Sequence, residues 1–135
     1  MSFRGTRQWF RDILQFTERL AMHTAGMDLE HFRTDVKTLD AVERNLQKIS
    51  EAAIRLGEEA ETLCPGPEWR DIRGLGNWLR HQYDGIDLDV IWHAATVDAS
   101  ALREAVLAAL PDLERSSGGR WRPTSSSFAE SSAGV

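Results

Sequence analysis

The sequence has a single cysteine, Cys64, so it can form neither an internal disulfide nor a cysteine-rich zinc site. It has no run of about 18 apolar residues, and residues 1–5 lack the apolar core of a signal peptide. We therefore expect a cytoplasmic protein without a membrane span. The formal net charge of −5 argues against binding of nucleic acid by bulk electrostatics, although it leaves room for a local basic patch.

The sequence also lacks the spacings of a metal site. Its four histidines and its carboxylates are scattered along the chain, without the short recurring intervals of metal ligands. We predict no metal and no cofactor. No useful stretch alternates apolar and polar residues at the period of two that a half-buried strand requires, so we predict no sheet.

Apolar residues recur instead at helical spacings of three and four. The first such set is Trp9, Ile13, Phe16 and Leu20. It predicts a helix that begins near Thr6 and stops before Gly26. Asp28 is a plausible N-cap for a short helix through Phe32.

The longest apolar stripe runs from Val36 to Leu63 and predicts one continuous helix of about eight turns. Gly57 falls inside this stripe, where it would weaken the helix slightly or allow a close contact with another helix. The sequence Pro65-Gly66-Pro67 ends the helix.

The next helix is expected to run from Trp69 to Tyr83, before an Asp-Gly turn. Asp87 then resembles the N-cap of a further helix, and a last helix begins at Asp98 or Ser100, with Pro111 loosening its end. Beyond Arg115 the composition turns to Ser, Gly and Ala. We predict an all-α bundle of about five helices in a domain of residues 1–115, followed by a disordered tail of residues 116–135.

Polar chemistry is densest in residues 69–83, which hold arginines, an asparagine, a histidine and a tyrosine. His81 could act as a general base or acid, because histidine titrates near neutral pH. Arg73, Asn77 and His81 are spaced by four residues and would share one helix face. A histidine next to an arginine fork is what metal-free RNA cleavage needs, although such a stripe is more often a solvated surface or a subunit contact.

The segment Asn77-Trp78-Leu79-Arg80-His81-Gln82-Tyr83, with the residues from Pro67 before it, resembles the signature region of HepT-like proteins of the HEPN superfamily of helical RNase toxins. The upstream run Asp40-Ala41-Val42-Glu43-Arg44-Asn45-Leu46 and the order of the helices are similar to that family as well. The resemblance covers residues 7–113.

The resemblance implies an all-helical, HEPN-like homodimer that cuts RNA, often tRNA, without a metal, in a cleft at the dimer interface. It implies His81 as the catalytic histidine, Asn77 as the polar residue of the motif, and Tyr83 as a tyrosine that a partner can modify with AMP. That partner is a minimal nucleotidyltransferase acting as antitoxin in a type II toxin–antitoxin pair.

One position departs from the family pattern. The arginine that the family usually places directly before the asparagine is Gly76 here. Either Arg73 or Arg80 supplies the cation, in the same protomer or across the dimer, or RNA cleavage is weak or lost. The alternative function is a helical dimer without catalytic activity that binds a nucleotidyltransferase or is modified by it.

Overall fold

The computed structural model describes residues 3–81 and 87–117 of the chain. These residues form seven α-helices and one π-helical turn, and none of them lies in a strand. The elements are α1 (Phe3–Thr24), α2 (Leu29–Arg33), α3 (Val36–Leu56), α4 (Glu59–Leu63), α5 (Trp69–Arg80), α6 (Leu88–His93), the π-helical turn η1 (Ala94–Asp98) and α7 (Ala99–Ser117). The predicted all-α class is confirmed, with more separate helices than the five expected.

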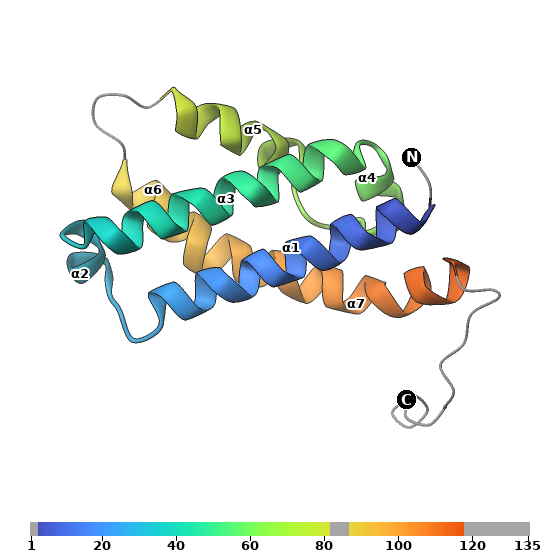
Figure 1. The fold of residues 1–135 in the computed structure, drawn as a ribbon, viewed down its shortest axis with the longest axis horizontal. Helices are drawn as coiled ribbons and strands as arrows, with labels where there is room; N and C mark the ends of the chain where they lie inside the picture. The colour runs from blue at the N-terminus through green and yellow to red at the C-terminus, as the bar shows by residue number, and fades with distance from the viewer. Residues whose placement is uncertain (1–2, 82–86, 118–135) are drawn as a thin grey trace.

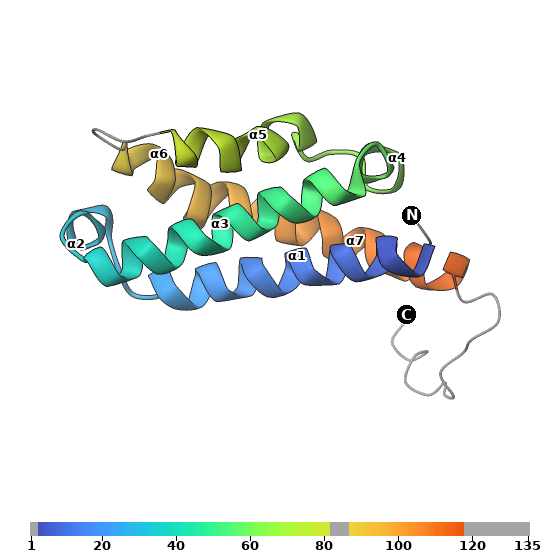
Figure 2. The ribbon, with the colours of Figure 1, turned by 45° about the horizontal axis from the view of Figure 1, so that its top comes forward.

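The long helices α1 and α3 lie side by side and run in opposite directions, with α2 at the turn between them (Figure 1). Helix α7 packs against α1, and α5 packs against α3 on the side away from α1 (Figure 2). The helix α3 therefore has a neighbour on each side, and its outer flank carries α5.

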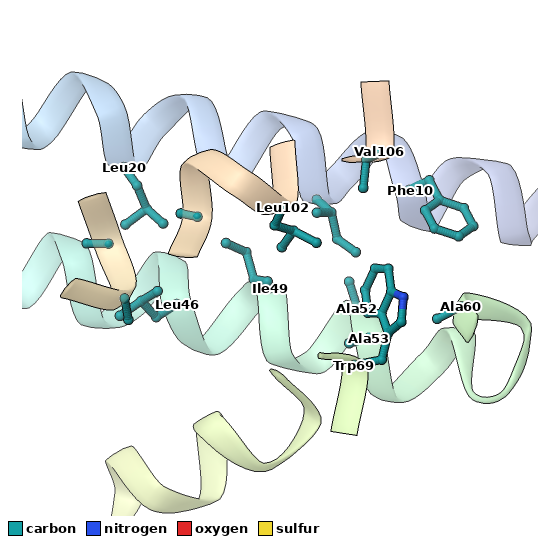
Figure 3. Packing of buried hydrophobic residues seen from close by; sticks show 14 of the residues in the cluster. Phe10, Leu20, Leu46, Ile49, Ala52, Ala53, Ala60, Trp69, Leu102 and Val106 are labelled. Atoms are coloured by element: carbon teal, nitrogen blue, oxygen red, sulfur yellow. The ribbon is translucent and has the colours of Figure 1, made fainter. Parts of the chain in front are cut away.

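The buried core lies between α1, α3 and α7 and is closed at one end by Trp69, the first residue of α5 (Figure 3). The Trp69 side chain is fully buried, and its ring meets that of Phe10 edge to face with centroids 6.1 Å apart. Its indole nitrogen donates a 2.8 Å hydrogen bond to the carbonyl oxygen of Cys64. These contacts fix the start of α5 against the bundle, since a buried indole N–H needs an acceptor.

Helix α1 begins at Phe3, so the prediction that Thr6 caps its N-terminus is wrong. Thr6 is buried inside the helix, and its hydroxyl donates a 2.7 Å hydrogen bond to a carboxylate oxygen of Glu59 on α4. The Thr6 side chain therefore makes a contact between helices, which the neighbouring sequence cannot predict.

The predicted cap at Asp28 is confirmed, because its side chain accepts a hydrogen bond from the backbone nitrogen of His31 at 2.8 Å.

The predicted continuous helix over residues 36–63 is also wrong, because it breaks at Gly57. There the backbone has φ of 59° and ψ of −144°, a conformation open essentially to glycine alone. The chain then forms the separate short helix α4 before the Pro-Gly-Pro segment. The break places α4 beside the beginning of α1 (Figure 1), where Thr6 reaches Glu59.

Asp87 caps α6 as predicted, with its carboxylate accepting from the backbone nitrogens of Asp89 and Val90. The last helix begins at Ala99, within the expected range. Pro111 lies inside it, and the helix continues to Ser117, so the expected loosening is wrong. Proline has no backbone N–H, so the carbonyl oxygen one turn earlier loses its helical hydrogen bond. Because Pro111 is exposed, that oxygen faces solvent.

Among the described residues, no helix is both long and apolar enough to cross a membrane. In the same part of the chain, no three histidine, cysteine or carboxylate side chains gather as a possible set of metal ligands.

Candidate active site

Helix α5 carries Arg73, Asn77 and Arg80, with His81 as its C-cap, and two hydrogen bonds and a shared cavity show its register on α3. Arg73 reaches the C-terminal end of α3 at Gly57, Gly76 meets Ser50 near the middle, and Arg80 lines the same cavity as Arg44, closer to the N-terminus of α3. The two helices therefore run antiparallel. The end of α5 that carries His81 faces the first turns of α3.

Ser50 on α3 contacts the backbone of α5 directly at Gly76. The Ser50 hydroxyl accepts a 3.0 Å hydrogen bond from the Gly76 nitrogen and donates one of 3.0 Å to the Arg73 carbonyl oxygen. A Cβ atom on residue 76 would lie 3.0 Å from that hydroxyl oxygen. Gly76 is therefore buried against α3, and a side chain there would begin inside the contact.

His81 is the C-cap of α5 and its side chain is exposed. Its ring nitrogen Nδ1 lies 2.8 Å from the backbone carbonyl oxygen of Asn77. A carbonyl oxygen only accepts hydrogen bonds, so Nδ1 carries the hydrogen, and Nε2 is the basic nitrogen of the neutral ring. The helix end thus fixes both the orientation and the tautomer of the imidazole.

Asn77 lies one turn before His81, as its spacing predicts, and its side chain is exposed. The contact that joins the two residues uses the backbone of Asn77, so its amide group is left facing outward. Tyr83, the predicted site of modification, lies outside the described residues.

Arg73 is held by an ion pair at the other end of α5. Its guanidinium lies 2.5 Å from a carboxylate oxygen of Glu61 and 3.3 Å from the carbonyl oxygen of Gly57. The hydrogen bond between the two side chains lowers the pKa of Glu61 and raises that of Arg73. Arg73 therefore ties α5 to the segment after α3, and about 12 Å of helix separates its backbone from that of His81.

Arg80 directly precedes His81 and is exposed. Its Nη1 atom lies 3.6 Å from the position that a Cβ atom on residue 76 would take. The guanidinium thus stands over the glycine, at the rim of a polar cavity of about 230 Å³ between α3 and α5. Arg80 forms no ion pair with any side chain of residues 5–81 or 87–115.

Comparison of the sequence with known proteins identifies a family. The profile of the Ribonuclease HepT-like family matches residues 13–109. This chain belongs to the HepT-like ribonuclease family.

Curated relatives of the HepT-like chain carry similar names. A protein of Thermococcus cleftensis named "Probable ribonuclease HepT" is 30% identical over 100 residues, which cover 74% of this chain and 91% of the relative. A protein of Methanocaldococcus jannaschii named "Putative RNase" is 26% identical over 84% of this chain and 98% of its own length. Another "Putative RNase", from Caldanaerobacter subterraneus, is 29% identical over 81% of this chain and 88% of its own length. No solved structure matches the chain.

A larger cavity of the HepT-like chain, about 690 Å³, lies between α5 and the α6–α7 segment. Apolar residues such as Ile72, Leu75 and Leu102 line it, and the four described site residues (Arg73, Asn77, Arg80 and His81) do not. His93 borders it and is exposed, with Nδ1 3.5 Å from a carboxylate oxygen of Asp98. The cavity is therefore separate from the His81 end of the HepT-like signature.

Glu43 is a half-buried acidic residue outside the motif. Its Oε2 atom is shielded from solvent and has no hydrogen-bond partner. Burial, together with the nearby Asp40, raises the pKa of this carboxyl. Glu43 lies two turns before Ser50 on α3, on the face that carries α5. Only the register between the two helices reveals this placement.

Proposed function

We propose that this chain is a metal-independent endoribonuclease that acts in the cytoplasm as the toxin of a type II toxin–antitoxin pair. Membership of the HepT-like ribonuclease family supports an RNA substrate. The observation that carries the catalytic part of the proposal is the arrangement of His81. Its Nδ1 is held on the Asn77 carbonyl oxygen, and Arg80 is the residue next to it in the chain.

In the proposed reaction, Nε2 of His81 takes the proton of a ribose 2′-hydroxyl. The 2′-oxygen forms a bond to the adjacent phosphorus while the bond from phosphorus to the 5′-oxygen breaks. The leaving oxygen takes a proton from the imidazolium ring or from water, and the products are a 2′,3′-cyclic phosphate and a 5′-hydroxyl. An arginine fork stabilises the charge on the phosphate oxygens, and Asn77 offers its outward amide as a further donor.

We assign the cation to Arg80 in preference to Arg73. Arg73 is neutralised by Glu61 and lies about 12 Å from His81 along the helix. Arg80 has no carboxylate partner in the described part of the chain and adjoins His81. It also stands over Gly76, the position at which the family arginine is missing.

The proposal extends to the partners that the family resemblance implies. The chain forms a homodimer whose protomers share the RNA cleft, with tRNA as one candidate substrate. A nucleotidyltransferase antitoxin binds it and silences it by joining AMP from ATP to the Tyr83 hydroxyl with release of pyrophosphate. The added negative charge beside the cleft opposes phosphate binding.

One observation favours a second candidate, a dimer without catalytic activity that binds a nucleotidyltransferase. Position 76 has no arginine, and a Cβ atom there would lie only 3.0 Å from the Ser50 hydroxyl oxygen. Under this alternative the chain retains the fold and the partner but cuts no RNA.

Expression of the protein alone separates the two candidates. We expect growth arrest with the wild type and normal growth with His81→Ala. In vitro, the purified wild type cleaves RNA in the presence of EDTA, and His81→Ala does not. His93→Ala is the matched control, because it removes an exposed histidine that pairs with Asp98 away from the signature. Equal growth and equal RNA integrity with wild type and His81→Ala would rule out the ribonuclease and leave the second candidate.

A further inference from the structure

We propose that the polar cavity over Gly76 binds a backbone phosphate of the RNA next to the phosphate that is cleaved, with Arg44 as its own cationic ligand and with the five-donor guanidinium of Arg80 shared between the two phosphates. This inference rests on the proposed function, and it adds α3 to the RNA-binding surface. Nothing in the signature of α5 points to Arg44.

Within residues 5–81 and 87–115, Arg44 and Arg80 have no acidic partner, as is also true of Arg19, Arg55 and Arg70, but only Arg44 and Arg80 line this cavity. Ion pairs with carboxylates hold Arg11, Arg33, Arg73, Arg103 and Arg115. Arg44 and Arg80 line the same cavity and make no ion pair within residues 5–81 and 87–115. A planar guanidinium with unused donors is the group best suited to a phosphate.

The walls of the cavity favour an anion. Arg44, Lys48 and Arg80 line it, and Glu51 is the one carboxylate among its described lining residues. The local excess of positive charge contrasts with the net charge of −5 of the whole chain. The Nζ of Lys48 lies 5.8 Å from the centre of the Phe16 ring on α1, so its charge is directed toward α1 and the two arginines are the cations nearest a bound phosphate.

Gly76 forms the floor of this cavity, and its lack of a side chain leaves the space open. A Cβ atom at residue 76 would come within 3.6 Å of the Arg80 guanidinium and against Ser50. The cavity of about 230 Å³ has room for a phosphate group with water, since one water occupies about 30 Å³ in the liquid. Because Arg80 adjoins His81, a phosphate bound here belongs to the same RNA strand as the scissile phosphate.

Fluorescence anisotropy with a labelled 2′-O-methyl oligouridylate tests the subsite in the wild-type background, because this RNA lacks the nucleophilic hydroxyl and stays intact. We expect Arg44→Gln to raise the Kd about 3- to 10-fold and to reduce the slope of log K against log salt by about 0.7, the value for one phosphate contact on a single strand. Arg80→Gln should have a similar effect.

Two variants control for general effects on the fold and on net charge. Glu51→Gln removes the carboxylate at the cavity and should lower the Kd about twofold, a change of sign that unfolding cannot produce. Arg103→Gln removes a cation that pairs with Glu18 between α7 and α1, and should leave the Kd within about twofold of the wild type.

Equal effects of Arg44→Gln and Arg103→Gln, or no tightening with Glu51→Gln, would overturn the subsite. A change of oligomeric state in Arg44→Gln at unchanged RNA affinity would show a protein interface instead and would overturn it too. If the wild type cuts no RNA while the Kd values shift as expected, the ribonuclease proposal fails and the phosphate site stands. If RNA is cut and Arg44→Gln binds like the control, only the subsite fails.

Discussion

The Ser50 hydroxyl on α3 accepts a 3.0 Å hydrogen bond from the backbone nitrogen of Gly76 on α5. The same hydroxyl donates to the carbonyl oxygen of Arg73, so one serine side chain bridges two backbone groups of the neighbouring helix. This contact sets how far α5 can slide along α3, and it thereby fixes which α3 residues stand opposite Arg80 and His81.

Two glycines of α5 give a matched test of that contact. Gly74→Ala should stabilise the protein by up to about 1 kcal/mol, because alanine is the better helix former and no atom lies within 4 Å of the new Cβ. Gly76→Ala gains the same propensity, but its Cβ meets Ser50 at 3.0 Å, and overpacking costs about 1 to 3 kcal/mol. Urea unfolding of the two variants should therefore give shifts of opposite sign. Equal stabilisation by both substitutions would show that the helices adjust freely.

Gly57→Ala tests the break between α3 and α4. We expect a loss of about 1 to 3 kcal/mol, because the φ of 59° with ψ of −144° is strained for any residue with a side chain. Thermal unfolding followed by circular dichroism measures it, with Gly74→Ala as the control for helix propensity. An unchanged or higher Tm for Gly57→Ala would mean that α3 can continue through this residue, as its apolar stripe suggests.

Arg73 and Arg80 should respond differently in an RNA cleavage assay. Arg80→Gln should lower kcat/KM about 100-fold, the loss typical of one donor to a developing oxyanion. Arg73→Gln should leave kcat/KM within about threefold, because the exposed ion pair with Glu61 that it removes acts on local packing. A larger loss with Arg73→Gln than with Arg80→Gln would reverse our assignment of the cation.

Glu43 gives a pH dependence whose sign follows from its raised pKa. The folded state binds the proton more tightly than the unfolded state, so this group stabilises the fold most below its ordinary pKa of about 4.3, and that stability is lost as the pH rises through the folded-state pKa. Glu43→Gln should therefore raise the Tm at pH 7, by about 1 to 3 °C after allowance for solvent screening.

The Tm gain of Glu43→Gln should shrink as the pH falls toward 4, a range in which the wild-type carboxyl takes up its proton. Glu51→Gln, at an exposed carboxylate on the same helix, serves as the control and should change the Tm little. A gain for Glu43→Gln that is the same at both pH values would mean that removal of the charge is not its cause.

The apolar spacing in the sequence predicted the helical class, and it predicted much of the core. Ile13, Leu20, Val42, Leu46 and Ile49 are buried as their periodicity indicates. Cap residues were also readable, because Asp28 and Asp87 act through nitrogens two or three residues ahead. Periodicity and caps depend on residues that are close together in the chain, so the amino-acid sequence shows them directly.

Features that depend on pairs of helices could not be predicted. The sequence shows Gly57 as one more residue in a stripe, and only the fold shows its positive φ. Likewise, Thr6 resembles an N-cap until Glu59 of α4 is placed beside it. At the site, the motif pointed to Arg73 and Arg80 equally, and the distinction came from Glu61, a carboxylate outside the motif.

The position of Arg80 over Gly76 has a consequence for how such proteins are compared. An alignment column records that residue 76 has no arginine, and a survey that uses the column would place this chain among the inactive members. In three dimensions a guanidinium stands within 3.6 Å of where that side chain would begin, supplied by a residue one turn later. On our proposal that Arg80 is the cation, the position of a guanidinium in space is a better guide to activity than the residue in one column.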